Sequence, residues 1–229
     1  MKKPTLFYIS DFNKVNDWTF PQVLIHQPGI DARILEAPGR IPEAKKKLLP
    51  KTPEDLKEAR IAMWEGLQDL KNQGKIKDIG VSNFTRFHLE QLIANPRCVE
   101  VPVLNQIEFN PYNADYDIVK ACKENNILVQ AYAPLGSSEK YQKGAGSKKV
   151  LENEVLVNMA AKKKNCTVAQ IALGWALSKG IGVVTKTEQE KRMKENISAT
   201  NMKLNDDEVK AIDAINIGQR FFCDKYSIL

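Results

Sequence analysis

The run Gly182–Thr187, with the sequence GVVTKT, is followed directly by Glu188–Asn196, with the sequence EQEKRMKEN. The β-branched apolar residues predict a buried strand over Ile181–Val184, and the charged run after them predicts a helix over Glu188–Ile197. A strand that passes at once into a helix is the repeating unit of α/β folds. We therefore expect an α/β fold built from units of this kind.

The start of that helix has the composition of an anion site. The first backbone N–H groups of a helix have no acceptor within the helix, and the helix dipole favours negative charge there. Lys186 adds a point charge, and Arg192 adds a planar guanidinium that can grip phosphate with two hydrogen bonds. Thr185 and Thr187 add hydroxyl groups. A nucleotide phosphate is the natural ligand, although a chain with 34 Lys and Arg residues also places two basic residues this close by chance.

Four more strands, each followed by at least one helix, are predicted before this unit. The strands are expected at Val23–Ile25, Ile76–Val81, Val101–Phe109 and Ile127–Tyr132. The helices are expected from Thr52 to the Gly74 stop, over Thr85–Asn95, Asp115–Asn125, Asn153–Lys164 and Val168–Ser178, with a final one at Asp206–Ile215. Strands joined by helical crossovers pair in parallel. This pattern leaves two architectures open, a barrel and an open sheet.

Composition limits the class of protein. With 229 residues and 43% hydrophobic content, the chain can bury a full core, and we expect one domain over residues 1–229. The net charge of +6 is carried by short lysine clusters without interleaved aromatic residues, which indicates solvated faces rather than a nucleic-acid surface. The apolar run Leu6–Ile9 is too short for a signal core or a membrane span, so we expect no membrane association.

The four cysteines show no metal-ligand spacing. Cys98, Cys122, Cys166 and Cys223 lie far apart, and no histidine stands at a distance typical of a zinc site. This pattern predicts reduced thiols in a cytoplasmic protein and no metal site.

Polar or aromatic residues follow the predicted strands at the edge where α/β folds place their sites. They are His26, Ser82 and Asn83, Asn105 with Gln106 and Glu108, Tyr132, and Lys186. Several also have a purely structural interpretation. His26 could be a hydrogen-bonded core residue, Ser82 and Asn83 could cap a helix, and Tyr132 could be core. Buried amides such as that of Gln106 need partners, and His88, near a helix start, is expected at the surface.

Taken together, these segments resemble the aldo-keto reductase family. The matching segments are Leu24–Pro28, Gly74–Ile76, Gly80–Phe84, Asn105–Tyr112, Ala131–Gly136 and Val184–Thr187 with Arg192, Glu195 and Asn196. They occur in family order over most of the chain. The resemblance implies an NADPH-binding (β/α)8 barrel, of which this chain would form a partial TIM-type barrel of about five βα units, the C-terminal part.

The resemblance also implies a role for each candidate residue. Ser82, Asn83 and Gln106 would hold the nicotinamide carboxamide, and Tyr132 would stack on the nicotinamide ring. Leu135 and Ser137 would line the pyrophosphate. Lys186, Thr187 and Arg192 would bind the 2′-phosphate, Glu195 and Asn196 would meet the adenine, and His26 would be the active-site histidine.

The chain departs from the family pattern in its first residues. The family places three strand-helix units before the His-bearing strand, and these supply an Asp, a general-acid Tyr and a Lys. Only 25 residues precede His26, whereas one βαβ unit needs roughly 30. Tyr8, Asp11 and Lys14 have the right residue types in the wrong order, and we do not expect them to substitute. Two further departures are Gln27, in place of a pocket Trp, and Thr185, in place of the usual Pro before Lys186.

These departures leave three hypotheses. The first is a weak NADPH-dependent reductase of aldehydes or ketones, with His26 as the candidate proton donor. The second is an inactive NADP(H)-binding protein with a structural or regulatory role. The third is a truncated product. A partial barrel also leaves strand edges unpaired, which predicts self-association unless the N-terminal segment, whose Leu6–Ile9 run could add a strand, covers them.

Overall fold

The computed structural model describes residues 6–8, 23–26, 52–137, 148–163 and 166–222. The chain divides into two compact units. Unit 1 comprises Met1–Asn16, Ile107–Tyr116 and Val129–Phe222, and unit 2 comprises Asp17–Gln106, Asp117–Leu128 and Cys223–Leu229.

Unit 2 is a parallel βα arrangement. It contains β2 (Val23–His26), α2 (Pro53–Asn72), β3 (Ile79–Ser82), α3 (Arg86–Ile93), the first residues of β4 (Leu104–Glu108) and most of α4 (Tyr116–Glu124). β3 pairs in parallel with β2 on one side and with β4 on the other. Its core includes Trp64, Ile79, Val81 and Leu89, each at most 1% exposed.

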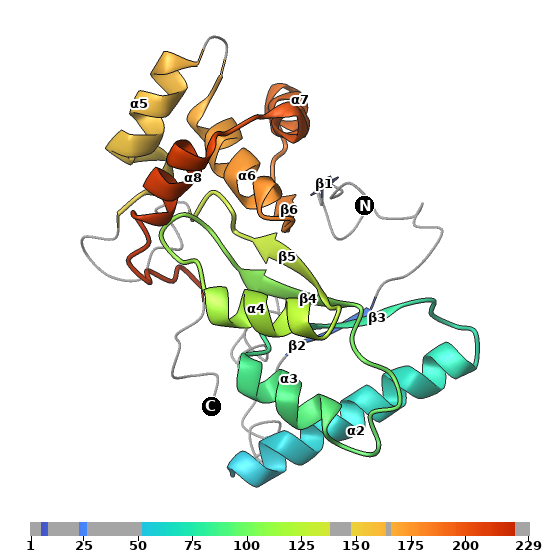
Figure 1. Cartoon of the computed structure of the whole chain (residues 1–229). Coiled ribbons are helices and arrows are strands. Elements are labelled where there is room, and N and C mark those ends of the chain that lie inside the picture. The colour runs from blue at the N-terminus through green and yellow to red at the C-terminus, as the bar shows by residue number, and fades with distance from the viewer. Residues whose placement is uncertain (1–5, 9–22, 27–51, 138–147, 164–165, 223–229) are drawn as a thin grey trace, which may run out of the picture. The chain divides into compact units, whose positions relative to one another are not determined.

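Unit 1 holds three described strands or most of them, and most of the later helices (Figure 1). Its elements are β1 (Leu6–Tyr8), most of β5 (Leu128–Tyr132), η3 (Val150–Glu152), α5 (Glu154–Lys162), α6 (Val168–Ser178), β6 (Gly182–Thr185), α7 (Glu190–Ser198), η4 (Ala199–Asn201) and α8 (Asp206–Asp213). β6 pairs in parallel with β5 and with β1. In the core, the rings of Phe109 and Trp175 stack with centroids 5.1 Å apart.

The predicted alternation of strands and helices is confirmed. α6 has the predicted bounds, and α2 begins with the predicted cap, because Thr52 accepts a hydrogen bond from Asp55 N–H and Asp55 accepts one from Thr52 N–H. β3 and β4 begin three residues later than predicted, because a bend at Lys77 and another at Val103 precede the paired residues. The Leu6–Ile9 run supplies β1, which covers one side of β6, and among the described strands only β3 pairs with β2.

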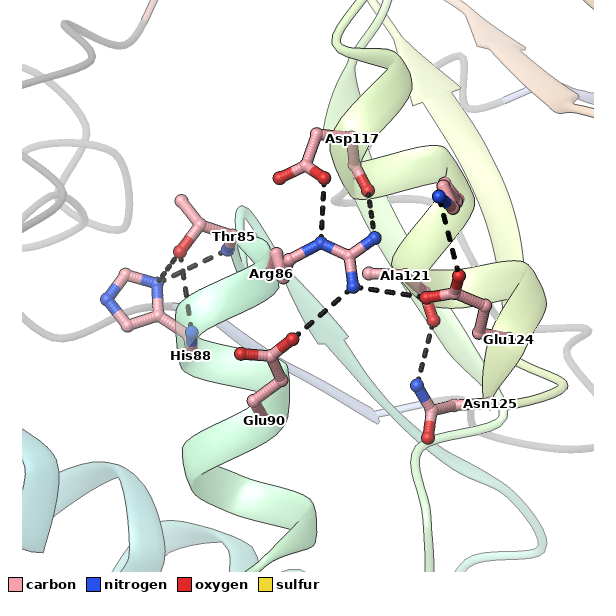
Figure 2. Close-up of polar contacts among 9 residues, drawn as sticks. Thr85, Arg86, His88, Glu90, Asp117, Ala121, Glu124 and Asn125 are labelled. Atoms are coloured by element: carbon pink, nitrogen blue, oxygen red, sulfur yellow. Dashed lines mark hydrogen bonds and ion pairs between the residues drawn. The ribbon is translucent and has the colours of Figure 1, made fainter.

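The expectation that His88 lies at the surface is wrong. Its side chain is 2% exposed and occupies the third helical position of α3. There the ring nitrogen Nδ1 accepts from Thr85 N–H at 3.3 Å, while Thr85 Oγ1 accepts from His88 N–H at 3.4 Å (Figure 2). The ring also meets Phe84 edge to face, with centroids 5.8 Å apart. The local hydrogen bond satisfies Nδ1 of the imidazole, and the contact with Phe84 packs the ring against an apolar neighbour.

Arg86, the first residue of α3, joins this helix to α4. Its Nε donates to Asp117 at 2.7 Å, and its NH1 group lies 3.1 Å from Glu124 and 3.3 Å from Glu90 (Figure 2). These carboxylates raise the pKa of the guanidinium, with the bond to Asp117 the largest cause. The positive charge of Arg86 at the start of α3 is therefore paired with carboxylates of the protein itself.

Candidate functional site

Three candidate residues of unit 2 lie side by side across the sheet. In the parallel register, His26 of β2 pairs with Ser82 of β3, and Ser82 pairs with Gln106 of β4. All three stand at or near the carboxyl ends of their strands. The sheet therefore brings together, at the level of the backbone, residues that are 24 or more positions apart in the sequence.

One backbone carbonyl organises the turn after β3. The C=O of Gln106 accepts from Ser82 Oγ at 3.0 Å and from Asn83 N–H at 2.8 Å. Asn83 has a φ of 59°, a left-handed conformation that asparagine tolerates better than most residues. Its side chain is 7% exposed and makes no hydrogen bond to the part of the chain that the structure describes. The predicted carboxamide-binding residues thus meet around one acceptor, with the Asn83 amide available.

In unit 1, Tyr132 ends β5 and leads into a tight turn. Ala133 and Gly136 have φ values of 49° and 75°, and Gly136 N–H donates to Ala133 C=O at 2.9 Å. A Cβ on Gly136 would lie 2.9 Å from Val150 Cγ2, so this turn needs glycine. The turn carries two further predicted residues, Leu135 and Ser137, both half-buried.

Tyr132 is held beside the last described residues of the chain. Its half-buried ring meets that of Phe222 edge to face, with centroids 6.1 Å apart. Glu108, 2% exposed, accepts from Phe221 N–H at 2.6 Å and from Phe222 N–H at 3.2 Å. Sequence reasoning noted Glu108 at a strand end but missed this role. The position of an acidic residue at the end of this strand was the signal available.

The region around the start of α7 carries two cations without partners among the described residues. Lys186 and Arg192 are both exposed, and neither forms an ion pair or hydrogen bond with any described residue. Arg192 stands at the third helical position of α7, and Thr187 Oγ1 accepts from Gln189 N–H at 3.2 Å. The two basic side chains therefore flank the start of α7 without partners.

The start of α7 is itself open. The N-cap residue Gln189 makes no side-chain hydrogen bond to the first turn. By contrast, α2, α3, α5, α6 and α8 each have an N-cap side chain that accepts from their first turn. Unsatisfied N–H groups at a helix start, with two unpaired cations beside them, suit an anionic ligand such as phosphate.

The last two predicted residues, Glu195 and Asn196, are fixed from two directions. Gln170 of α6 donates to Glu195 C=O at 3.2 Å and to Ser198 Oγ at 2.6 Å. Asn196 Nδ2 donates to Thr185 Oγ1 at 3.2 Å. Neither the role of Gln170 nor the Thr185 contact was predicted from the sequence, because both residues lie on other elements than α7.

Some predictions fall elsewhere. The structure places the backbone of Tyr8 in β1, while Asp11, Lys14 and Gln27 lie outside the described residues. Over those same described ranges, no group of three His, Cys, Asp or Glu residues could hold a metal ion. None of the helices among them is both long and apolar enough to cross a membrane.

Comparisons with known proteins point to one family. The model of the "Aldo/keto reductase family" matches residues 22–217. "Aldo-keto reductase family 1 member C23" of Equus caballus is 38% identical over 160 residues, which are 70% of this chain and 49% of that protein. "Prostaglandin-E(2) 9-reductase" of Oryctolagus cuniculus is 37% identical over 167 residues, 73% of this chain and 52% of that protein.

Solved structures give the same result. An aldo-keto reductase from a Medee basin deep-sea metagenome library matches with a TM-score of 0.65 and 30% identity, covering 73% of this chain and 58% of the other. A Bombyx mori aldo-keto reductase in complex with NADP matches with a TM-score of 0.64 and 32% identity, covering 72% and 52%. The chain spans about half the length of the curated relatives that it matches.

Proposed function

Because the chain belongs to the aldo/keto reductase family, we propose that it binds NADPH and uses it to reduce the carbonyl group of an aldehyde or ketone. The observation that carries this proposal is the pair of unpartnered cations, Lys186 and Arg192, at the open start of α7. A 2′-phosphate offers these groups the charge and acceptor oxygens that they lack within the described protein. NADH has no such group.

The other candidate residues complete the proposed cofactor contacts. Ser82, Asn83 and Gln106 would hold the nicotinamide carboxamide, whose donors and acceptors match those of amide side chains. Tyr132 would offer a flat face to the nicotinamide ring, and Leu135 and Ser137 would line the pyrophosphate. Thr187 would add a hydroxyl to the 2′-phosphate contacts, and Glu195 and Asn196 would meet the adenine.

Binding is tested by fluorescence titration of the chain with NADPH and with NADH. We expect Arg192→Ala to weaken NADPH binding by about tenfold or more, since a charge-assisted hydrogen bond contributes roughly 1.5–3 kcal/mol, and to leave NADH binding nearly unchanged. Lys194→Ala is the matched control, because Lys194 lies on the same helix and pairs with Glu190 at 2.6 Å. An equal loss for both cofactors would refute the 2′-phosphate assignment.

Turnover is the second part of the proposal. NADPH held by these residues would supply a hydride to the carbonyl carbon, and a proton donor of the chain would then be needed for the carbonyl oxygen. Of the residue types at these three positions in register, only histidine ordinarily serves as a general acid near neutral pH. We therefore propose that His26 donates the proton and that reduction is slow, by about 10²–10⁴-fold relative to an enzyme with a full general acid.

Single-turnover reduction of an aromatic aldehyde separates this enzyme from a protein that binds NADP(H) without turnover, our second candidate. We expect a slow rate that His26→Ala abolishes while NADPH still binds. A fast rate that survives His26→Ala would show that another group is the acid.

The thiols of Cys98, Cys122 and Cys166 are free, which fits a cytoplasmic location. Self-association through strand edges stays a prediction.

A further inference from the structure

Thr185 makes a contact that ties a strand end to the helix after it. It is the last residue of β6 and is 5% exposed, and its Oγ1 accepts from Nδ2 of Asn196 in α7 at 3.2 Å. Asn196 is also 5% exposed. The proline that the family resemblance leads us to expect at position 185 has no hydroxyl, so this contact depends on the departure seen in this chain.

The contact leaves Asn196 with one oriented and unused acceptor. Its amide nitrogen is engaged by Thr185, whereas its oxygen Oδ1 makes no hydrogen bond to any residue that the structure describes. Among the described residues, Oδ1 is not one of the fully buried side-chain atoms without a partner. A donor from outside the protein can therefore reach it. Because a carboxamide is planar, fixing its nitrogen also fixes the direction of its oxygen.

The Thr185 hydroxyl is not the only contact that holds this turn of α7. Gln170 of α6 donates to Glu195 C=O and to Ser198 Oγ, and Ser198 Oγ donates to Glu195 C=O at 2.7 Å. The Gln170 side chain is itself fixed by Thr167, whose N–H donates to Gln170 Oε1 at 2.8 Å. The helix backbone is therefore anchored from α6, and the contribution of Thr185 is to the orientation of one side chain.

We propose that Thr185 is a positioning residue that aims the Asn196 carbonyl oxygen at the exocyclic amino group of the cofactor's adenine, and so selects adenine over a base with a carbonyl at that position. This inference rests on the proposed NADPH binding. An oxygen acceptor gains a hydrogen bond from an amino group, whereas it opposes a carbonyl oxygen without one.

The test compares binding of NADPH and reduced nicotinamide hypoxanthine dinucleotide phosphate, in which a carbonyl and a ring N–H replace the adenine amino group and ring nitrogen. We expect the wild-type chain to bind NADPH more tightly than the hypoxanthine analogue by roughly 3- to 10-fold, the difference in affinity that one hydrogen bond typically produces. Thr185→Val, which keeps the shape and removes the hydroxyl, should lose most of this preference. Thr185→Ser should retain it, and so should the control Thr200→Val, which removes the Thr200 hydroxyl that donates to Ile197 C=O at 2.9 Å.

Asn196→Ala gives a second measurement that does not need a folded Thr185→Val variant. It should lose the same preference, and adding Thr185→Val to it should change the preference no further, because the hydroxyl acts only through the amide. An unchanged preference in Thr185→Val, or an equal loss of both dinucleotides, would overturn the inference while leaving NADPH binding intact. If the wild-type chain binds neither dinucleotide, the proposed function fails and this inference fails with it.

Discussion

α3 and α7 both begin just after a parallel strand, and the loop before each carries predicted cofactor residues, yet their first turns differ. The start of α3 is closed by Thr85 and His88, and the charge of Arg86 is taken up by nearby carboxylates (Figure 2). The start of α7 has no side-chain cap, and Arg192 has no partner among the described residues. A closed start suits an uncharged ligand group beside it, and an open start suits an anion.

This difference separates the two proposed ends of the cofactor. The carboxamide is assigned to Ser82 and Asn83, before the closed helix, and the 2′-phosphate is assigned to Lys186 and Thr187, before the open one. Adding an N-cap side chain at the start of α7 should therefore weaken phosphate binding and raise the stability of the chain.

Closing the start of α7 should have the largest effect on binding. In Gln189→Asp, a carboxylate at the N-cap would accept from the free N–H groups and repel the phosphate, so we expect NADPH binding to weaken by about 10- to 100-fold. The same change should raise thermal stability, since a cap contributes about 1 kcal/mol. Titration and melting of the same sample measure both. Gln189→Asn, a cap without charge, should stabilise the chain with a smaller loss of affinity; if neither variant weakens NADPH, the open start is not the phosphate site.

Protonating the cap of α3 should destabilise the chain. Burial, together with the charge of Arg60, lowers the pKa of His88 from 6.5 to about 4. At a pH between these two pKa values, His88 is protonated in the unfolded chain and neutral in the folded chain. The free energy of unfolding should therefore fall as pH drops from 6.5 to 4, by on the order of 2 kcal/mol. Denaturant unfolding across this range measures it.

His88→Gln is the control for that pH dependence. Glutamine at the third helical position can still accept from the cap N–H but does not titrate. Its stability should depend less on pH than that of the wild-type chain. Identical pH profiles for the two proteins would show that His88 is not the titrating group.

Removing an amide side chain from the residues proposed to bind the nicotinamide carboxamide should weaken the binding of both cofactors. We expect Gln106→Leu to weaken NADPH and NADH by the same factor, about tenfold, because the nicotinamide is common to both. The contrast with Arg192→Ala, which should affect NADPH alone, assigns each group to its end of the cofactor. Selective loss of NADPH in Gln106→Leu would reverse that assignment.

Salt should produce the smallest effect. Lys186 and Arg192 are exposed, so their attraction for a 2′-phosphate is screened as the Debye length falls to about 3 Å at 1 M salt. We expect the preference for NADPH over NADH to shrink by a few-fold between low salt and roughly 1 M. A preference that does not change with salt would indicate recognition by buried groups instead.

Local sequence signals predicted much of this fold. The cap at Thr52 and the bounds of α6 follow from residues adjacent in the sequence, and both are confirmed. The burial of His88 was missed, because a histidine in the first turn of a helix is compatible with the surface, and only the packing shows that its ring caps the helix and contacts Phe84. The pairing of β1 with β6 and the contact of Thr185 with Asn196 depend on which elements meet, which a residue pattern does not encode.

The turn that joins β3 to α3 has a consequence for engineering. Its two anchoring donors, Ser82 Oγ and Asn83 N–H, converge on the main-chain oxygen of residue 106, an atom that every amino acid supplies. A library that varies the side chain at position 106 can therefore alter what the loop recognises while the loop keeps its shape. Chemical diversity can thereby be introduced at one position, a favourable starting point for directed evolution of recognition at the nicotinamide end of the proposed cofactor.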